Sequence, residues 1–223
     1  MYESRDWESD TYTRLPYKVQ DNYKNFFNTG VTWTNSLAID AGDGKGQSMR
    51  VSIKDVRNSW IVPNTGYNAQ SVGVSMSSKK NRYINAQAKI NYYRKHSDNL
   101  PISGYSDSSP LKSLMWLPVS VTDRGVYSEY ANNYTDLYWE QNEGTLINNQ
   151  SDNPYLMSYE HLNTQQRDRL YGNVSVTANL YRDILTLTLR TGIDLNNDFR
   201  TQRKPFYSRS YLQGMYREQT TRK

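Results

Sequence analysis

Few residues in this chain are placed to do chemistry. Its two histidines, His96 and His161, stand beside expected loop boundaries, and neither has a second histidine at the spacing of a metal site. The sequence contains no cysteine, which excludes a disulfide framework and a thiolate metal site. We therefore expect no bound metal and no cofactor.

The carboxylates give only weak patterns. Asp40 and Asp43 flank glycines as in a calcium loop, but the other EF-hand ligands are absent, so a hairpin turn is the better interpretation. Residues 42–46 lack the spacing of a phosphate-binding loop. Other acidic residues gather in one polar stretch: Glu129, Asp136, Glu140 and Glu143. These could include an acid–base pair, although a solvated loop is the default. No nucleophile elbow occurs, and we expect no enzyme.

The sequence elements that would carry these residues are predicted to be β-strands. Apolar and polar residues alternate from Leu170 to Leu180 and again from Leu185 to Ile193, with only Tyr181 to Ile184 between the two runs. Each run is about 11 residues long, which is the length that a tilted strand needs to cross a bilayer. The pattern predicts a long antiparallel hairpin.

Four shorter alternating runs precede this hairpin, at residues 31–40, 49–54, 72–76 and 84–92. The connections alternate in length. Short turns at 42–46, 79–82 and 181–184 separate longer connections, which lie around Pro63, at 97–163 and from 197 onward. Outer-membrane barrels show this asymmetry, whereas a β-sandwich has no reason to keep one end short. The sequence favours an all-β fold of about six antiparallel strands in a partial transmembrane β-barrel.

Composition agrees with a barrel better than with a soluble domain. Hydrophobic residues make up 36% of the 223 residues, and 20 Tyr outnumber 4 Phe, so a dry core would be thin. The net charge of +5 would permit a polyanionic partner, but the basic residues are scattered except near the C-terminus. That Arg/Tyr-rich end could contact nucleic acid. A truncated loop explains it better, and we expect no nucleic acid partner.

Several short strings resemble the SusC/RagA family of TonB-dependent outer-membrane transporters of Bacteroidota. They are Phe26–Gly30, Ile61–Gly66, Ser97–Asn99, Asp152–Tyr155 and Arg167–Ser175. None is diagnostic alone, but their order and spacing cover most of residues 26–196.

The resemblance implies that the chain is a fragment of a larger plugged barrel of about 22 strands. Residues 1–30 would be the end of an extracellular loop, and residues 31–196 would be barrel strands with a long extracellular loop at 97–163. Residues 197–223 would begin the next loop. The short turns would face the periplasm. The signal peptide and the plug would belong to parts of the protein that this sequence lacks.

The function that the resemblance implies is import of an oligosaccharide, or of a peptide in some members. A SusD-like lipoprotein would close the barrel, TonB with ExbB and ExbD would supply energy through regions missing here, and outer-membrane lipid would surround the wall. Polar strand residues would face the lumen: Arg50, Lys54, Asn85, Gln87, Lys89, Asn91, Asn173, Asn179 and Arg190. Loop aromatic residues could stack on sugars or contact the lid: Trp116, Tyr127, Tyr130, Tyr134, Tyr138 and Trp139.

Two alternatives remain open from the sequence. A soluble all-β glycan-binding module would need a face of bulky apolar residues, but Ala86, Ala88, Gly172 and Ala178 are small for such a core. An outer-membrane barrel with a structural or adhesive role would look the same in this region.

Overall fold

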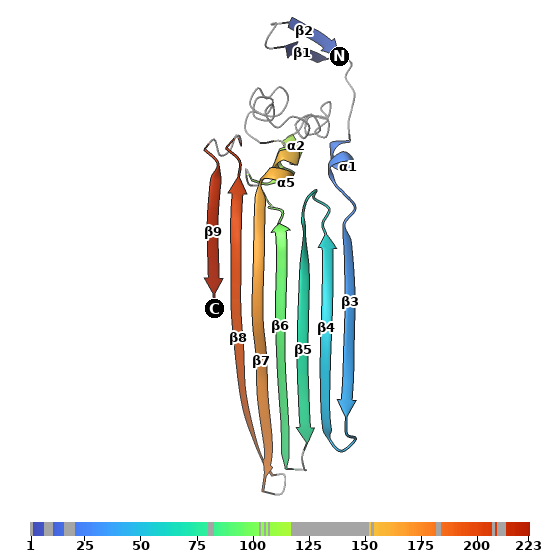
Figure 1. Cartoon of the computed structure of the whole chain (residues 1–223), viewed down its shortest axis with the longest axis vertical. Coiled ribbons are helices and arrows are strands. Elements are labelled where there is room, and N and C mark those ends of the chain that lie inside the picture. Colours follow the sequence, from blue (N-terminus) through green and yellow to red (C-terminus); the bar gives the residue numbers. More distant parts are fainter. Residues whose placement is uncertain are drawn as a thin grey trace.

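The computed structural model describes residues 2–6, 11–15, 21–79, 83–102, 104, 106, 108–116, 152, 154–181, 184–206, 208 and 213–223. Its main element is one antiparallel sheet with the strand order β3-β4-β5-β6-β7-β8-β9 (Figure 1). The strands are β3 (Val31–Gly42), β4 (Gln47–Ser59), β5 (Gly66–Lys79), β6 (Ile84–Asn99), β7 (Leu162–Leu180), β8 (Leu185–Lys204) and β9 (Met215–Arg222). Each pairs with its neighbour in sequence, so the sheet is a simple meander.

The remaining elements are short. A separate two-stranded sheet joins β1 (Tyr2–Asp6) and β2 (Thr11–Leu15). The helices are α1 (Asn22–Phe26), α2 (Pro110–Trp116) and α5 (Pro154–Glu160). Among the residues described, no helix is both long enough and apolar enough to cross a membrane.

The open, partial antiparallel sheet expected from the sequence is confirmed, with one correction to the strand count. The sheet has seven strands rather than six, because β9 forms within residues 197–223, where a loop was expected. The asymmetry of the connections also appears in space. The strand ends that the three short connections join lie at one end of the sheet, and the strand ends that the longer connections join lie at the other (Figure 1).

The two faces of the sheet differ in chemistry. In an antiparallel ladder, directly paired residues point to the same side. One such row runs Leu37, Ile53, Val72, Tyr92, Leu170 and Leu195 across β3 to β8. The next row towards the short turns runs Ile39, Val51, Val74, Ile90, Gly172 and Ile193. We call this side the apolar face and the opposite side the polar face.

The apolar face changes character at a single row, which we call the boundary row. It consists of Asn35, Asp55, Gln70, Arg94, Asp168 and Asn197, each paired with the next. Within it, Arg94 lies 3.9 Å from Asp168, and Tyr92 donates a hydrogen bond of 2.6 Å to Asp168 from the row below. On strands β4 to β7 every position of this face beyond the boundary row, up to Thr164, is polar or glycine.

Nothing among the described residues covers the apolar face. Leu37 is 62% exposed on β3, Ile90 is 48% exposed on β6 and Leu189 is 70% exposed on β8. A soluble β-sandwich would bury such side chains under a second sheet. Exposure of this extent over six strands is typical of a surface that meets lipid or another apolar partner.

One glycine on this face is required by close strand approach. A Cβ at Gly172 would lie 2.4 Å from the carbonyl oxygen of Lys89 and 3.1 Å from the Cα of Ile90. The missing side chain also leaves a shallow apolar groove of about 390 Å³ bordered by Ile90, Val174 and Ile193. The small residues on this face therefore shape the surface rather than fill a core.

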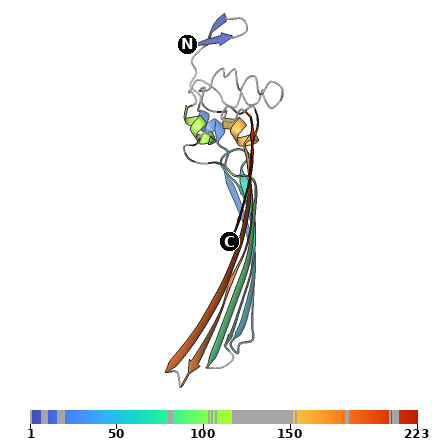
Figure 2. The same ribbon diagram turned by 90° about the vertical axis from the view of Figure 1, so that its left-hand side faces the viewer.

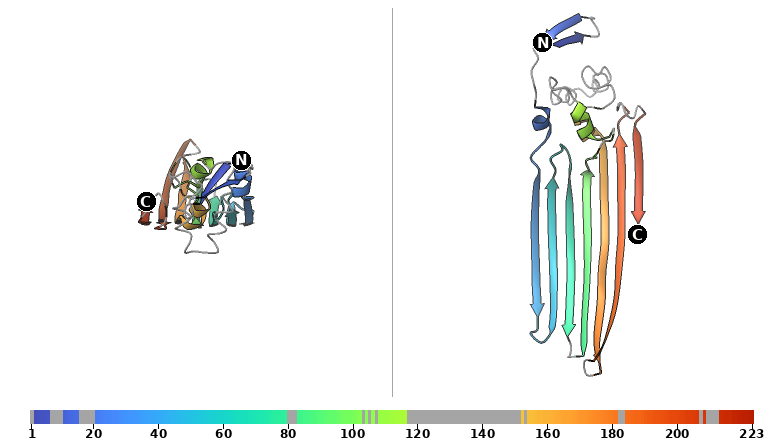
Figure 3. Two further views of the ribbon diagram at one scale, coloured as in Figure 1. Left: turned by 90° about the horizontal axis from the view of Figure 1, so that it is seen from above. Right: turned by 180° about the vertical axis from the view of Figure 1, so that it is seen from behind.

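The buried core lies at the end of the sheet that carries the long connections. It is built from Phe26 of α1, Val62 of the β4–β5 loop, Leu114 of α2 and Tyr155 of α5. Phe26 and Tyr155 meet edge to face with ring centroids 5.2 Å apart. We call this assembly the end cap. Figure 2 shows that the sheet is bowed and that α1 and α2 lie on the side towards which the strands bend, and Figure 3 shows α2 beside the sheet from above.

Candidate functional site

The polar face is the first candidate surface. Alternation along each strand places all the strand residues predicted to face the lumen on this one face. Arg50, Ser75, Lys89 and Asn173 form one register row, and Ser77, Gln87, Ser175 and Arg190 form the next. Lys54, Asn85, Asn91 and Asn179 share the same side, two or four residues along their strands. That this face lines a lumen stays a prediction.

Three ion pairs lie on the polar face. Asp194 accepts hydrogen bonds of 2.8 and 2.5 Å from the Arg169 guanidinium, and Asp198 accepts bonds of 3.0 and 2.9 Å from Arg200. Asp40 lies 3.5 Å from Arg50 across the β3–β4 ladder. The two bidentate pairs fix the direction of their arginines, which a single contact would not.

Tyrosines accompany these cations. The Lys95 ammonium lies 4.7 Å from the ring centre of Tyr67, and the Arg169 guanidinium lies 4.9 Å from that of Tyr171. Tyr171 lies within the predicted strand, whereas Tyr67, Lys95 and Arg169 were missed from the sequence because the alternation was followed only as far as the apolar residues extend. Continuing the period of two farther towards the long connections on β5, β6 and β7 would have found them.

The polar face also has a hollow. About 330 Å³ lies over Arg50, Ser75, Gln87, Lys89 and Asn173, so residues of four strands border one volume. Its border also includes Asp40 and the apolar side chains of Met49 and Met76. The hydroxyl, amide and cationic groups can hydrogen-bond a hydroxylated or anionic ligand.

The second candidate is the end cap, where the strings that carry the family resemblance meet. Asn28 donates its backbone N–H to the carbonyl of Ile61 at 2.8 Å. The Asn99 side chain donates to the carbonyl oxygens of Asn64 and Ser158 at 3.1 and 2.9 Å. Four of the strings, more than 100 residues apart at their extremes, thus form one packed unit. These contacts hold α1, α2 and α5 together at one end of the sheet.

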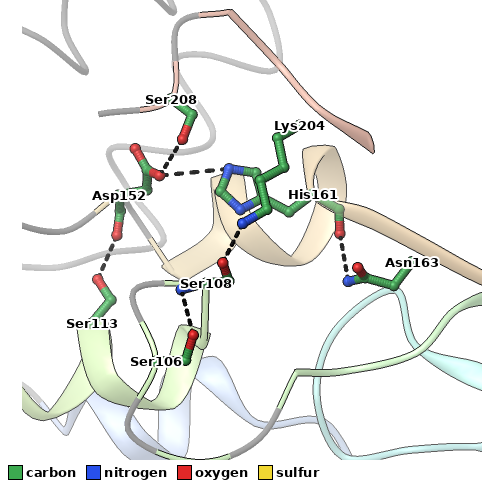
Figure 4. Close-up of polar contacts among 8 residues, drawn as sticks. All are labelled: Ser106, Ser108, Ser113, Asp152, His161, Asn163, Lys204 and Ser208. Carbon is green, nitrogen blue, oxygen red and sulfur yellow. Dashed lines mark hydrogen bonds and ion pairs between the residues drawn. The ribbon is translucent and has the colours of Figure 1, made fainter. Parts of the chain in front are cut away.

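A buried polar cluster ties this cap to β8 (Figure 4). Ser208 donates a hydrogen bond of 2.6 Å to the carboxylate of Asp152, and Ser113 donates one of 2.5 Å to its backbone carbonyl. The Lys204 ammonium donates to the hydroxyl of Ser108. Two segments of the connection between β6 and β7, one with Ser108 and Ser113 and the other with Asp152, are therefore joined to the end of β8. The side chains that join them are almost wholly buried.

His161 is the titratable centre of this cluster. It is 2% exposed, and its Nε2 lies 3.5 Å from Asp152 without the alignment of a hydrogen bond. Burial lowers the pKa of His161 to about 4; the nearby Asp152 opposes this shift, and Lys204 reinforces it. The imidazole is therefore neutral at pH 7. No serine hydroxyl reaches its ring among the described residues, so the trio of Ser208, Asp152 and His161 lacks the contact of a catalytic triad.

We expect the end cap to loosen as the pH falls from 6.5 towards 4. In that window the imidazole of the unfolded chain binds a proton and the imidazole of the folded chain does not. The contribution of neutral His161 to the free energy of unfolding is therefore complete above pH 6.5 and is lost as the pH falls towards 4. Over the whole window the free energy of unfolding falls by roughly 3 kcal/mol, at about 1.4 kcal/mol per pKa unit. Hydrogen exchange of the α5 amides in the membrane-embedded protein, corrected for the slower intrinsic exchange at acid pH, should show protection factors that fall accordingly. His161→Asn should abolish this fall in protection; an unchanged pH profile in that variant would assign it to another group.

The turn residues singled out from the sequence have structural roles. Asp43 accepts backbone N–H groups of Lys45 and Gln47 at 2.8 and 2.9 Å, the bond from Gln47 being the larger cause of the lowered pKa of Asp43. This is the expected hairpin turn. His96 pairs with Asp98 at 2.9 Å. Within the described part of the chain, no three His, Cys, Asp or Glu side chains gather as a metal site would require.

The predicted loop aromatics are mostly beyond the structure described. Trp116 is the last residue of α2. Outside the described residues lie Tyr127, Tyr130, Tyr134, Tyr138 and Trp139, together with the loop carboxylates Glu129, Asp136, Glu140 and Glu143. Their contact with a substrate or lid stays a prediction.

Comparison with known proteins shows the fold. No family model matches the chain, and no curated protein matches it in sequence. Among solved structures, it is similar to the RagAB peptide importer in the "closed-closed" state, with a TM-score of 0.65 and 14% identity. The match covers 92% of this chain and 22% of the importer chain, so this sequence spans about a fifth of that protein. That neighbour is a transporter and not an enzyme.

Proposed function

We propose that this chain is part of the barrel wall of a TonB-dependent outer-membrane importer of the SusC/RagA type and has no catalytic role. One observation carries the proposal: the sheet has an uncovered apolar face and an opposite polar face, and its long connections share one end. Lipid would meet the apolar face, and the polar face would line the transport path. The likeness in fold to a peptide importer supports this interpretation.

The partners follow from the same proposal. A SusD-like surface lipoprotein would close the end that carries the cap, and TonB with ExbB and ExbD would act through other parts of the protein. The cargo would be an oligosaccharide or a peptide. The exposed apolar side chains, such as Ile39 at 62%, speak against a soluble glycan-binding module, because water would meet them. No feature of the described residues favours an adhesive role over transport.

These 223 residues contain no cysteine, so a cysteine introduced here is unique within this part of the protein. The test uses single-cysteine variants of the intact protein in its own outer membrane, with any cysteine elsewhere in the protein replaced by serine. Asn173→Cys and Val174→Cys are adjacent on β7, both exposed, and on opposite faces. A small charged thiol reagent reacts with the thiolate, which forms in water and not in lipid. We expect Asn173→Cys to react at least about tenfold faster.

The same two variants unfolded in denaturing detergent supply the control, because their rates should then be equal. Equal rates in the native membrane, or faster reaction at Val174→Cys, would mean that the apolar face does not meet lipid. The proposed function would then lose its basis.

A further inference from the structure

The charge on the polar face is unbalanced. On strands β3 to β8, the acidic side chains of this face are Asp40, Asp194 and Asp198. Each is already held by one arginine, through the pairs with Arg50, Arg169 and Arg200. The other cations on this part of the polar face therefore have no carboxylate of that face left to pair with, and we call them the surplus cations.

Three of these surplus cations lie in the wall between the turns and the cap. Lys54, Lys89 and Arg190 have no carboxylate partner among the described residues. Lys89 shares a register row with Arg50, two strands away or about 10 Å at the usual strand spacing. Arg190 stands on the next row towards the turns. Cations repeated at this spacing create a positive field along the wall rather than a single pocket.

The apolar face supplies an internal comparison. Near the boundary row, Arg57 lies 3.3 Å from Asp55, and Arg94 lies 3.9 Å from Asp168. These arginines at the edge of the apolar band thus each have a carboxylate, Arg57 within its own strand and Arg94 on the neighbouring strand. On the opposite side, Lys54 of β4, Lys89 of β6 and Arg190 of β8 have no such partner among the described residues, so unpaired cations gather on the polar face.

The groups around the surplus cations favour one kind of ligand. The hollow over Arg50 and Lys89 is bordered by Ser75, Gln87 and Asn173, by Asp40, which Arg50 holds, and by the apolar side chains of Met49 and Met76. Serine and amide groups suit the hydroxyls of a sugar, and the unpaired cations suit acidic groups carried on it. Tyr67 and Tyr171, farther along the wall, offer rings on which sugar faces can stack.

From this we infer that the cargo is an acidic oligosaccharide, one that carries carboxylate or sulfate groups, and that Lys54, Lys89 and Arg190 guide it along the wall. This inference rests on the proposed function, since it takes the polar face as the transport path. It narrows the cargo from any oligosaccharide or peptide to an anionic sugar polymer.

The test measures binding of labelled hexagalacturonate, maltohexaose and hexaglutamate to the full-length transporter in detergent. We expect hexagalacturonate to bind at least about tenfold more tightly than neutral maltohexaose, and raising NaCl from 50 to 500 mM to weaken it by about tenfold. Lys89→Gln should weaken it about two- to fivefold, and the triple variant Lys54→Gln, Lys89→Gln, Arg190→Gln about tenfold or more. Lys45→Gln, which removes a charge from the turn, should leave binding unchanged.

Each other outcome overturns the inference. If hexagalacturonate and maltohexaose bound equally, or if neither bound, the inference would be wrong. It would also be wrong if the lysine and arginine variants bound hexagalacturonate normally; the surplus cations would then face an acidic segment of the longer chain. Tightest binding of hexaglutamate would instead assign an acidic peptide as cargo. The cysteine-labelling result separates these failures from failure of the proposed function, because it reports the two faces without any cargo.

Discussion

Replacing Leu189 by arginine is expected to destabilise the membrane-embedded protein by about 2–4 kcal/mol. Leu189 is 70% exposed and stands near the middle of the apolar run from Leu185 to Leu195. In the proposed orientation its side chain meets the centre of the bilayer, where a charge on the lipid face of a barrel costs this much. Urea unfolding of the intact barrel in phospholipid vesicles measures the difference.

Two matched variants make this result specific. Thr188→Arg places the same charge one residue away on the polar face, beside native Arg190, and should change stability by less than about 1 kcal/mol. Leu195→Arg places it next to the boundary row and should cost only about 0–1 kcal/mol, because the penalty falls towards the interface. If Leu189→Arg and Thr188→Arg had equal effects, the two faces would meet the same medium.

The second large effect concerns the 223 residues expressed by themselves. We expect almost all of this polypeptide to sediment from aqueous buffer. In the described sheet, β3 and β9 each pair with one neighbour only, so two edges keep unpaired backbone groups. Open edges and an uncovered apolar face both promote association between copies. Analytical ultracentrifugation with and without detergent measures the outcome.

Detergent should reverse the behaviour, because micelles cover apolar side chains such as Leu37 and Leu187. The detergent-bound form should show a strand-rich circular dichroism spectrum. A monodisperse monomer in plain buffer that unfolds in one cooperative transition would contradict the prediction and favour a soluble module.

The faces of the strands could be predicted from sequence because lipid exposure requires a strict alternation. From Leu170 to Leu180 every second residue is apolar or small, and the register places that series on one face. A one-residue slip would invert the pattern, so sequence fixes the orientation of each strand well. The turn at Asp43 was predictable for a similar local reason, since its side chain caps its own loop.

The lengths of the strands could not be predicted in the same way. The β7 strand begins at Leu162, and β8 continues to Lys204, well past the boundary row. Beyond that row most residues of both faces are polar, as in Gln165 and Gln166, so the period of two is lost although the hydrogen-bonded ladder continues. The β9 strand lies wholly in this zone and was missed for the same reason.

The end cap escaped prediction because its contacts join distant segments. Phe26, Val62, Leu114 and Tyr155 come from three separate segments, the last two both from the connection between β6 and β7, and none of these segments shows a periodic pattern. The sequence strings that suggested the family do include three of these residues. They indicated that the connections matter without indicating that they pack together.

The strands extend well beyond the boundary row. The 20 residues of β8 extend about 65 Å at the usual rise per residue. The apolar run of that strand takes up little more than half of this, which for a strand tilted by about 40° matches a hydrocarbon band of about 25 Å. The rest of the strand, from Asn197 to Lys204, is hydrogen-bonded to β7 on one side and to β9 on the other. It would extend above the bilayer as a rigid rim. In the proposed orientation, such a rim would place the entrance of the pore clear of the lipid headgroups, so that a large cargo could reach it without contact with the membrane surface.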